Sequence, residues 1–182
     1  GTNPEYDYSF NYQNWYPSAE YECKNTIKNV GLFELSPFSK YEIKGEKAHE
    51  ELQRLCTANI KNEIGKCTYT HMLNEGAGIE TDLTVVCIDK NHYRIISSAA
   101  VRTHDKAHIL KHLSKDIEFK DVTDELICLG IFGPKSRDLL SKITNEDLSN
   151  ENFKFGTGKN INFNSIDVWV QRLSYVGELG YE

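Results

Sequence analysis

The sequence predicts an α+β fold whose strands are mostly antiparallel. Strand-like runs follow one another closely and are separated by short turns rich in Gly and Asn, which is typical of antiparallel hairpins. Helical patterns interleave with these runs, and no internal repeat or low-complexity linker interrupts them. With 182 residues, of which 39% are apolar, the chain can bury a substantial core without a disulfide or metal staple.

Local patterns predict the individual elements. Ser18 and Thr103 are suitable N-caps for two helices, and Pro134 favours an early position in a third. The Gly-containing loop 74–78 joins two alternating runs and therefore predicts a β-hairpin. In chain order, the expected helices cover residues 18–29, 46–56, 103–113 and 134–140, and the expected strands cover 32–35, 41–45, 67–73, 79–88, 93–97, two runs within 118–134, and the stretch 160–177.

Composition excludes several classes of partner. The net charge of -6 argues against nucleic-acid or anionic-membrane binding, since both require clustered positive charge. No apolar run approaches the roughly 20 residues needed to span a bilayer. The five cysteines are an odd number, form no C-x-x-C pair, and in three cases lie inside strand-like runs. They indicate buried, reduced thiols in a cytosol-like compartment.

Asp82 is the most informative acidic residue. On the second strand of the predicted hairpin it shares a face with Val86 and Ile88, while Leu83 and Val85 take the other face. A carboxylate in that row either lies at a strand end in water or is held in a site. Spacing alone favours a simple turn cap. A partly desolvated carboxylate, by contrast, could exchange protons with a substrate amine near neutral pH.

A second acidic candidate lies in the segment YVGELGYE, residues 175–182, where small spacers impose a tight turn after a strand. A carboxylate beside an aromatic ring, such as Glu178 or Glu182, would accept the paired N–H donors of a pterin in bidentate fashion. The alternative is a purely structural turn.

Three other patterns favour ordinary structural roles. His104, His108 and His112 form one stripe of a helix, but neighbouring lysines repel a cation, so a solvated face is expected and no metal site. The glycines of 156–159 form too short a loop to cradle phosphate. Cys56 has no histidine in a fixed relation to it and is not expected to act as a nucleophile.

Four segments, taken in order, resemble one family. They are VGLFELSPFSKYEIKG (30–45), YTHMLNEGAGIETDLTV (69–85), GIFGPKSRDLL (130–140) and RLSYVGELGYE (172–182). Their order and spacing resemble the folate-binding aminomethyltransferase domain of the glycine cleavage T-protein. The hairpin carries Thr81-Asp82 where T-protein typically has paired aspartates, and is more similar to the sarcosine and dimethylglycine dehydrogenase branch.

The resemblance implies roles for four residues. Asp82 matches a family aspartate near the N5 and N10 atoms of tetrahydrofolate and near the substrate amine, so it is expected to be catalytic. Tyr69 matches a tyrosine on the facing strand that lines the same pocket. Tyr175 and Glu182 match the tyrosine and glutamate that hold the pterin ring.

The family fold also implies a domain organisation. Residues 1–40 and 124–182 would form one discontinuous folate-binding domain, and 41–123 a second domain. A third, barrel-like domain would follow, so the chain is expected to be a fragment of a longer protein. In the dehydrogenase branch an FAD-dependent amine oxidase domain precedes the folate domain. FAD is therefore expected only in a separate upstream domain of the same polypeptide.

The implied activity is tetrahydrofolate-dependent one-carbon transfer. The methylene of an oxidised N-methyl amine (sarcosine or dimethylglycine) would yield 5,10-methylenetetrahydrofolate, in the bacterial cytoplasm or the mitochondrial matrix. The expected partners are folate and a small-molecule amine. Three alternatives stay open: an aminomethyltransferase of the glycine cleavage system acting on a lipoyl carrier, a folate-dependent demethylase acting on a sulfonium or methoxy group, and a non-catalytic regulatory paralogue.

Overall fold

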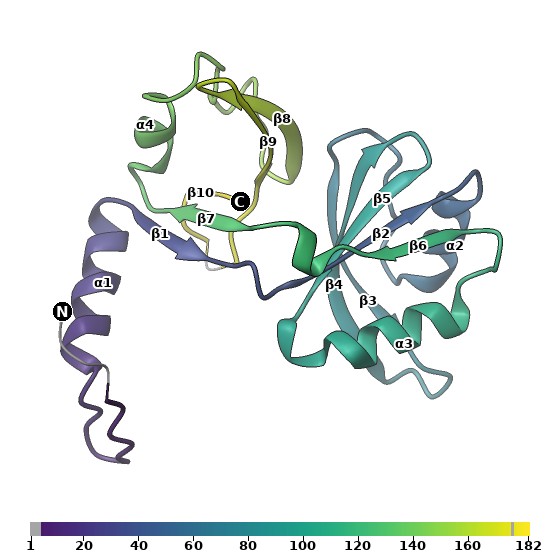
Figure 1. Cartoon of the computed structure of the whole chain (residues 1–182), viewed down its shortest axis with the longest axis horizontal. Helices are drawn as coiled ribbons and strands as arrows, with labels where there is room; N and C mark the ends of the chain where they lie inside the picture. Colours follow the sequence, from purple (N-terminus) through teal and green to yellow (C-terminus); the bar gives the residue numbers. More distant parts are fainter. Residues whose placement is uncertain (1–4, 176) are drawn as a thin grey trace.

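The structure, a computed structural model, describes residues 5–175 and 177–182. Strands and helices alternate along this part of the chain (Figure 1). The α-helices are α1 (Tyr16–Lys28), α2 (Ala48–Leu55), α3 (Arg102–His112) and α4 (Ser136–Leu140), with single 3-10 turns at Ala99–Val101 and Thr123–Glu125. The strands are β1 (Gly31–Glu34), β2 (Ser39–Lys44), β3 (Cys67–Leu73), β4 (Ile79–Asp89), β5 (His92–Ser97), β6 (Glu118–Asp121), β7 (Leu129–Phe132), β8 (Thr157–Phe163), β9 (Ile166–Arg172) and β10 (Gly180–Tyr181).

A five-stranded antiparallel sheet forms the middle of the chain. Its order is β3-β4-β5-β2-β6, and consecutive hairpins β3–β4 and β4–β5 build its first half. Alternate side chains such as Tyr41 and Ile43 point into one core, which Leu52 of α2 and Ile109 of α3 complete. The two helices therefore cover one face of this sheet, and the opposite face carries polar and charged side chains together with the buried Val86.

A three-stranded sheet, β1-β7-β10, brings together segments that are far apart in the sequence. β7 lies in the middle and pairs antiparallel with both neighbours. The β8–β9 hairpin stands beside it (Figure 1), and its turn places Asn164 and Ser165 at positive φ, as a two-residue hairpin requires. A second core lies here, with Phe153, Ile161 and Tyr181 among its buried residues.

Two segments connect the sheets, and they are fastened to each other. The backbone N–H of Leu35 donates to the carbonyl of Cys128, and that of Val122 donates to the carbonyl of Lys40, each at 2.9 Å. The Lys40 N–H donates to the buried Thr123 hydroxyl at 2.9 Å. The chain thus crosses between the sheets twice, along paths that hydrogen bonds hold together.

The predicted α+β class with mostly antiparallel strands is confirmed. The division into 1–40 plus 124–182 and 41–123 stays a prediction; all five strands of the larger sheet come from residues 39–121. The expected strand over 160–177 ends earlier, because β9 stops at Arg172 and an irregular segment follows. In the described part of the chain, no helix combines the length and the apolar character that crossing a membrane demands.

The predicted helix starts are wrong by a few residues. α1 begins at Tyr16, ahead of Ser18, because a proline fits its first turn and sets the helical φ there. α3 begins at Arg102, ahead of Thr103, because a 3-10 turn leads directly into it. Neither helix has a capping side-chain hydrogen bond. The short α4 begins two residues after Pro134.

Candidate functional site

The β3–β4 hairpin places Tyr69 and Asp82 together on the face of the sheet that the helices leave uncovered. In the antiparallel register Tyr69 lies opposite Thr84, and His71 lies opposite Asp82. Tyr69 and Asp82 are therefore diagonal neighbours, a spacing that long aromatic side chains can bridge. The Tyr69 hydroxyl donates to Asp82 Oδ2 at 3.2 Å.

The hairpin pattern behaves as the sequence predicted. Leu83, Val85 and Cys87 are buried, and Asp82 points to the opposite, open side. The register shifts at both ends of β4, between Ile79 and Thr81 opposite β3 and between Cys87 and Asp89 opposite β5, and the alternation holds from Thr81 to Val85. The carboxylate is exposed, and its Tyr69 contact makes it part of a polar cluster.

The environment of Tyr69 favours its neutral hydroxyl. Partial desolvation of the hydroxyl raises the pKa of Tyr69, and the negative charge of Asp82 and the hydrogen bond to it act in the same direction. Tyr175, in the segment after β9, adds a smaller electrostatic effect that also raises the pKa of Tyr69. A neutral tyrosine can both donate and accept a hydrogen bond beside the carboxylate.

Glu182 is a half-buried carboxylate that follows β10. Its backbone pairs with Gln171 of β9 in both directions, N–H to carbonyl at 2.7 and 2.8 Å. Burial raises the pKa of Glu182, and no Lys or Arg forms an ion pair with it within the described residues. Such a carboxylate lacks a donor of its own and is suited to accept N–H groups from a ligand.

Glu182 lies on the same side of the hairpin as Tyr69. Burial raises the pKa of the Cys67 thiol to about 12 and that of Cys128 to about 11, and the charge of Glu182 adds to both. Cys67 and Tyr69 are two residues apart on β3, so their side chains share a face with a separation of about 7 Å along the strand. Glu182 thus acts electrostatically on Cys67, which shares a strand face with Tyr69.

Tyr175 is the predicted site residue with the least contact to the others. Its ring is 97% exposed, within the irregular segment that joins β9 to β10. A cavity of about 430 Å³ lies along this segment, with Phe155, Arg172 and Glu178 among its lining residues. The Tyr175 side chain is therefore exposed to solvent beside this cavity.

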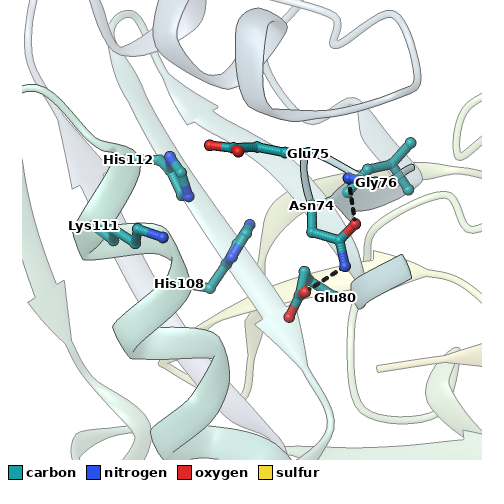
Figure 2. A pocket seen from close by; sticks show the side chains of 8 residues that line it. Asn74, Glu75, Gly76, Glu80, His108, Lys111 and His112 are labelled. Carbon is teal, nitrogen blue, oxygen red and sulfur yellow. Dashed lines mark hydrogen bonds between the residues drawn. The ribbon is translucent and has the colours of Figure 1, made fainter. Parts of the chain in front are cut away.

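A second cavity, of about 560 Å³, lies between α3 and the turn of the β3–β4 hairpin. Figure 2 shows His108, Lys111 and His112 facing this turn, where Asn74 donates to Glu80 at 2.8 Å. The helix face that was expected to be simply solvated therefore also lines a cavity. No group of three or more His, Cys, Asp or Glu residues in the described ranges is arranged to hold a metal ion.

Sequence reasoning missed His71 as a member of the hairpin cluster. Its Nε2 lies 3.5 Å from the Tyr69 hydroxyl oxygen, and the two rings meet edge to face at 5.3 Å. Counting the register outward from the loop 74–78 would have placed His71 opposite Thr81; an irregularity between Met72 and Leu73 shifts it opposite Asp82. Cys56, which the sequence did not favour as a nucleophile, is buried, and burial raises the pKa of its thiol to about 12.

Comparison with known proteins gives one family. Residues 3–182 match the family described as GCVT N-terminal domain. The chain is 38% identical, over its whole length, to 4-methylaminobutanoate oxidase (formaldehyde-forming) of Paenarthrobacter nicotinovorans. It is 36% identical, again over its whole length, to mitochondrial dimethylglycine dehydrogenase of Rattus norvegicus. The chain spans 22% of the length of each of these relatives.

A solved structure shares the fold. Aminomethyltransferase T of the glycine cleavage system from Bartonella henselae superposes with a TM-score of 0.77 at 22% sequence identity. The match covers 97% of this chain and 48% of that one. The predicted T-protein-like fold is thereby confirmed.

Proposed function

The chain belongs to the GCVT N-terminal domain family, and on that premise we propose that it contributes to a tetrahydrofolate site where the carbon of an oxidised N-methyl amine is transferred. The amine class follows from the names of the relatives, which act on 4-methylaminobutanoate and dimethylglycine. Tetrahydrofolate supplies the nucleophilic nitrogens that receive the carbon, giving the 5,10-methylene form.

The observation that carries this proposal is the arrangement on the open hairpin face. Asp82 with its Tyr69 donor lies on one part of that face, and the half-buried Glu182, which has no Lys or Arg ion pair within the described residues, acts electrostatically on Cys67 of the same strand face. A pterin has a planar pair of N–H donors and a reactive amine on opposite parts of its ring system. The N–H pair would donate to the carboxylate of Glu182, and the reactive amine would lie beside Asp82.

Each residue then has a distinct task. Glu182 accepts the pterin donors, and Tyr175 covers the ring, so that the reacting amine is held close to the carbon it receives. Asp82 takes the proton that the amine loses, or stabilises the positive charge that precedes this loss. Tyr69 orients the Asp82 carboxylate through its hydrogen bond.

The oxidation of the amine belongs to another part of the protein in this proposal. An FAD-dependent amine oxidase domain in the same polypeptide would produce the iminium, and this domain would take it before water does. The bacterial cytoplasm or the mitochondrial matrix would be the compartment of the full-length protein; one relative is named as mitochondrial.

The test is a titration of the full-length protein with tetrahydrofolate or the stable 5-formyl form. Glu182→Gln should weaken binding by roughly 2–5 kcal/mol, the loss expected when a buried charged partner is removed. Glu151→Gln is the control, because it removes an exposed carboxylate outside the segment 175–182 and should change affinity little.

Binding that ignores Glu182 would refute the pterin role of this residue. No binding at all would favour a regulatory paralogue that has kept the fold. A glycine-cleavage activity would instead be indicated if a lipoyl carrier protein stimulated the transfer and no flavin accompanied the full-length protein.

A further inference from the structure

His71 is a titratable side chain on the open hairpin face that the proposed function leaves unused. It is half-buried and stands directly opposite Asp82 in the β3–β4 register. The Tyr69 hydroxyl lies between the two, 3.2 Å from Asp82 Oδ2 and 3.5 Å from His71 Nε2. One hydroxyl therefore connects a carboxylate with an imidazole.

We propose that His71 is a proton-relay residue for the transfer reaction, acting on Asp82 through the Tyr69 hydroxyl. This inference rests on the proposed function, since it assigns a destination to the proton that Asp82 removes. An imidazole suits this task because it changes its charge near neutral pH.

The relay balances in protons and needs no electron transfer. When the folate amine bonds to the incoming carbon, its N–H bond breaks and the proton forms an O–H bond on Asp82. Asp82 then gives this proton to the Tyr69 oxygen, while the hydroxyl proton of Tyr69 passes to His71 Nε2. The result is a carboxylate, a neutral tyrosine and an imidazolium, and the imidazolium releases its proton to water.

The segment that packs against His71 brings no competing cation to the relay within the described residues. Segment 56–58 packs against β3 by backbone bonds, with Thr57 N–H donating to the His71 carbonyl at 2.9 Å, and it carries no charged side chain. Besides Asp82, Tyr175 is a titratable group that acts electrostatically on Tyr69. No ion pair found in the described ranges involves Asp82 or His71. The 3.5 Å contact is long, as catalytic hydrogen bonds often are before ligand binds.

A structural role for His71, through its edge-to-face packing on Tyr69, gives different expectations. Replacing His71 by Gln keeps a polar side chain of similar reach but removes the titrating ring. In the full-length protein we expect His71→Gln to bind folate as the wild type does, yet to transfer the carbon roughly 10- to 100-fold more slowly.

The pH profile separates the two roles. A protonated imidazole cannot accept a further proton, so wild-type transfer should fall toward acidic pH. His71→Gln should lose this limb of the profile, and added imidazole should restore transfer to His71→Ala. His112→Gln, on α3 and outside the cluster, is the control and should keep the wild-type profile. An unchanged limb in His71→Gln, or failure of imidazole rescue, would overturn the relay.

A measurement without turnover tests the same link. In Asp82→Ala the Tyr69 hydroxyl loses its carboxylate acceptor and should donate to His71 Nε2, which holds the ring in the Nδ1–H tautomer. Nitrogen chemical shifts of 15N-labelled histidine report this tautomer, and adding Tyr69→Phe should abolish it. If the tautomer does not respond, the relay is wrong even where folate binding to the wild type supports the proposed function. Absence of folate binding, by contrast, would refute the proposed function.

Discussion

At the scale of single residues, Asp82 combines exposure with one hydrogen-bond donor, the Tyr69 hydroxyl at 3.2 Å. Asp82→Asn keeps the shape of this side chain but cannot take up a proton. We therefore expect folate affinity to stay near that of the wild type, and single-turnover transfer to slow by roughly 10²–10⁴, the usual contribution of a general base. Rapid-quench transfer assays beside a folate titration measure both. Equal transfer rates would rule out a proton-accepting role.

Glu182 is a candidate binding residue whose charged form lowers the stability of the folded protein. Burial raises the pKa of Glu182, so the folded state holds the carboxyl proton more tightly than the unfolded chain does. Stability is therefore full below the ordinary value of 4.5 and declines as the pH rises through the raised pKa. Glutamine has no charge to desolvate, so Glu182→Gln should melt at a higher temperature than the wild type at pH 7.

The same comparison at pH 4 supplies the control for Glu182. There both side chains are largely neutral, and the melting temperatures should converge. Thermal unfolding of wild type and variant at the two pH values measures this. A variant that is less stable at pH 7 would show that the carboxylate has a favourable partner. The predicted gain would accompany weaker folate binding, which is the pattern of a site residue that costs stability.

At the scale of elements, Glu42 fastens β2 to β5. It stands opposite Arg94, whose guanidinium lies 2.7 Å from Glu42 Oε1, and Lys44 Nζ lies 3.2 Å from Oε2. Burial acts to raise the pKa of Glu42, but the hydrogen bonds from Arg94 and Lys44 and the charges of Arg94 and His92 prevail and lower it to about 2. Its contribution is thus present above 4.5 and lost as the pH falls toward 2.

Glu42→Gln should therefore cost roughly 2–3 kcal/mol of unfolding free energy at pH 7 and almost nothing near pH 2. Urea unfolding at both pH values measures this difference. Glu118→Gln, on the exposed side of β6, is the matched control and should stay within about 0.5 kcal/mol of the wild type. An equal cost at both pH values would mean that shape, and not charge, makes Glu42 matter.

What the sequence could predict was local. Alternation and the glycine loop give the β3–β4 hairpin and the outward direction of Asp82, whereas the position of Tyr69 beside it depends on the register shift between Met72 and Leu73 and was expected only from the family resemblance. The approach of Glu182 to Cys67 could not be predicted by pattern, because it depends on β10 pairing with β7 and on a backbone pair with Gln171. Such pairings are fixed by the packing of distant segments. The family resemblance, not periodicity, pointed to Glu182.

At the scale of the whole molecule, the candidate site depends on two sheets. Asp82 belongs to the five-stranded sheet, and Glu182 follows a strand of the three-stranded sheet (Figure 1). A ligand that meets both needs the sheets in a fixed relation. The two hydrogen-bonded segments that connect the sheets supply this fixed relation. Within the first of them, Lys40 Nζ also donates to the carbonyls of Ser36 and Phe38 at 2.8 and 2.7 Å.

Thr123 is the residue through which this relation can be tested. Its hydroxyl accepts from the Lys40 N–H at 2.9 Å and donates back to the Lys40 carbonyl at 3.4 Å, and the side chain is 5% exposed. Thr123→Val has nearly the same shape but leaves the Lys40 N–H without its partner. Urea unfolding should show a loss of about 1–3 kcal/mol, the cost of a buried unsatisfied donor.

Folate affinity should fall together with this stability, although Thr123 contacts neither Asp82 nor Glu182. Thr103→Val is the matched control, because Thr103 is exposed on α3, and it should leave affinity unchanged and stability within about 0.5 kcal/mol of the wild type. A folate titration of both variants in the full-length protein measures the effect. If Thr123→Val lost stability but kept its folate affinity, the two carboxylates would act independently of the crossing, and the site would depend on the hairpin face alone.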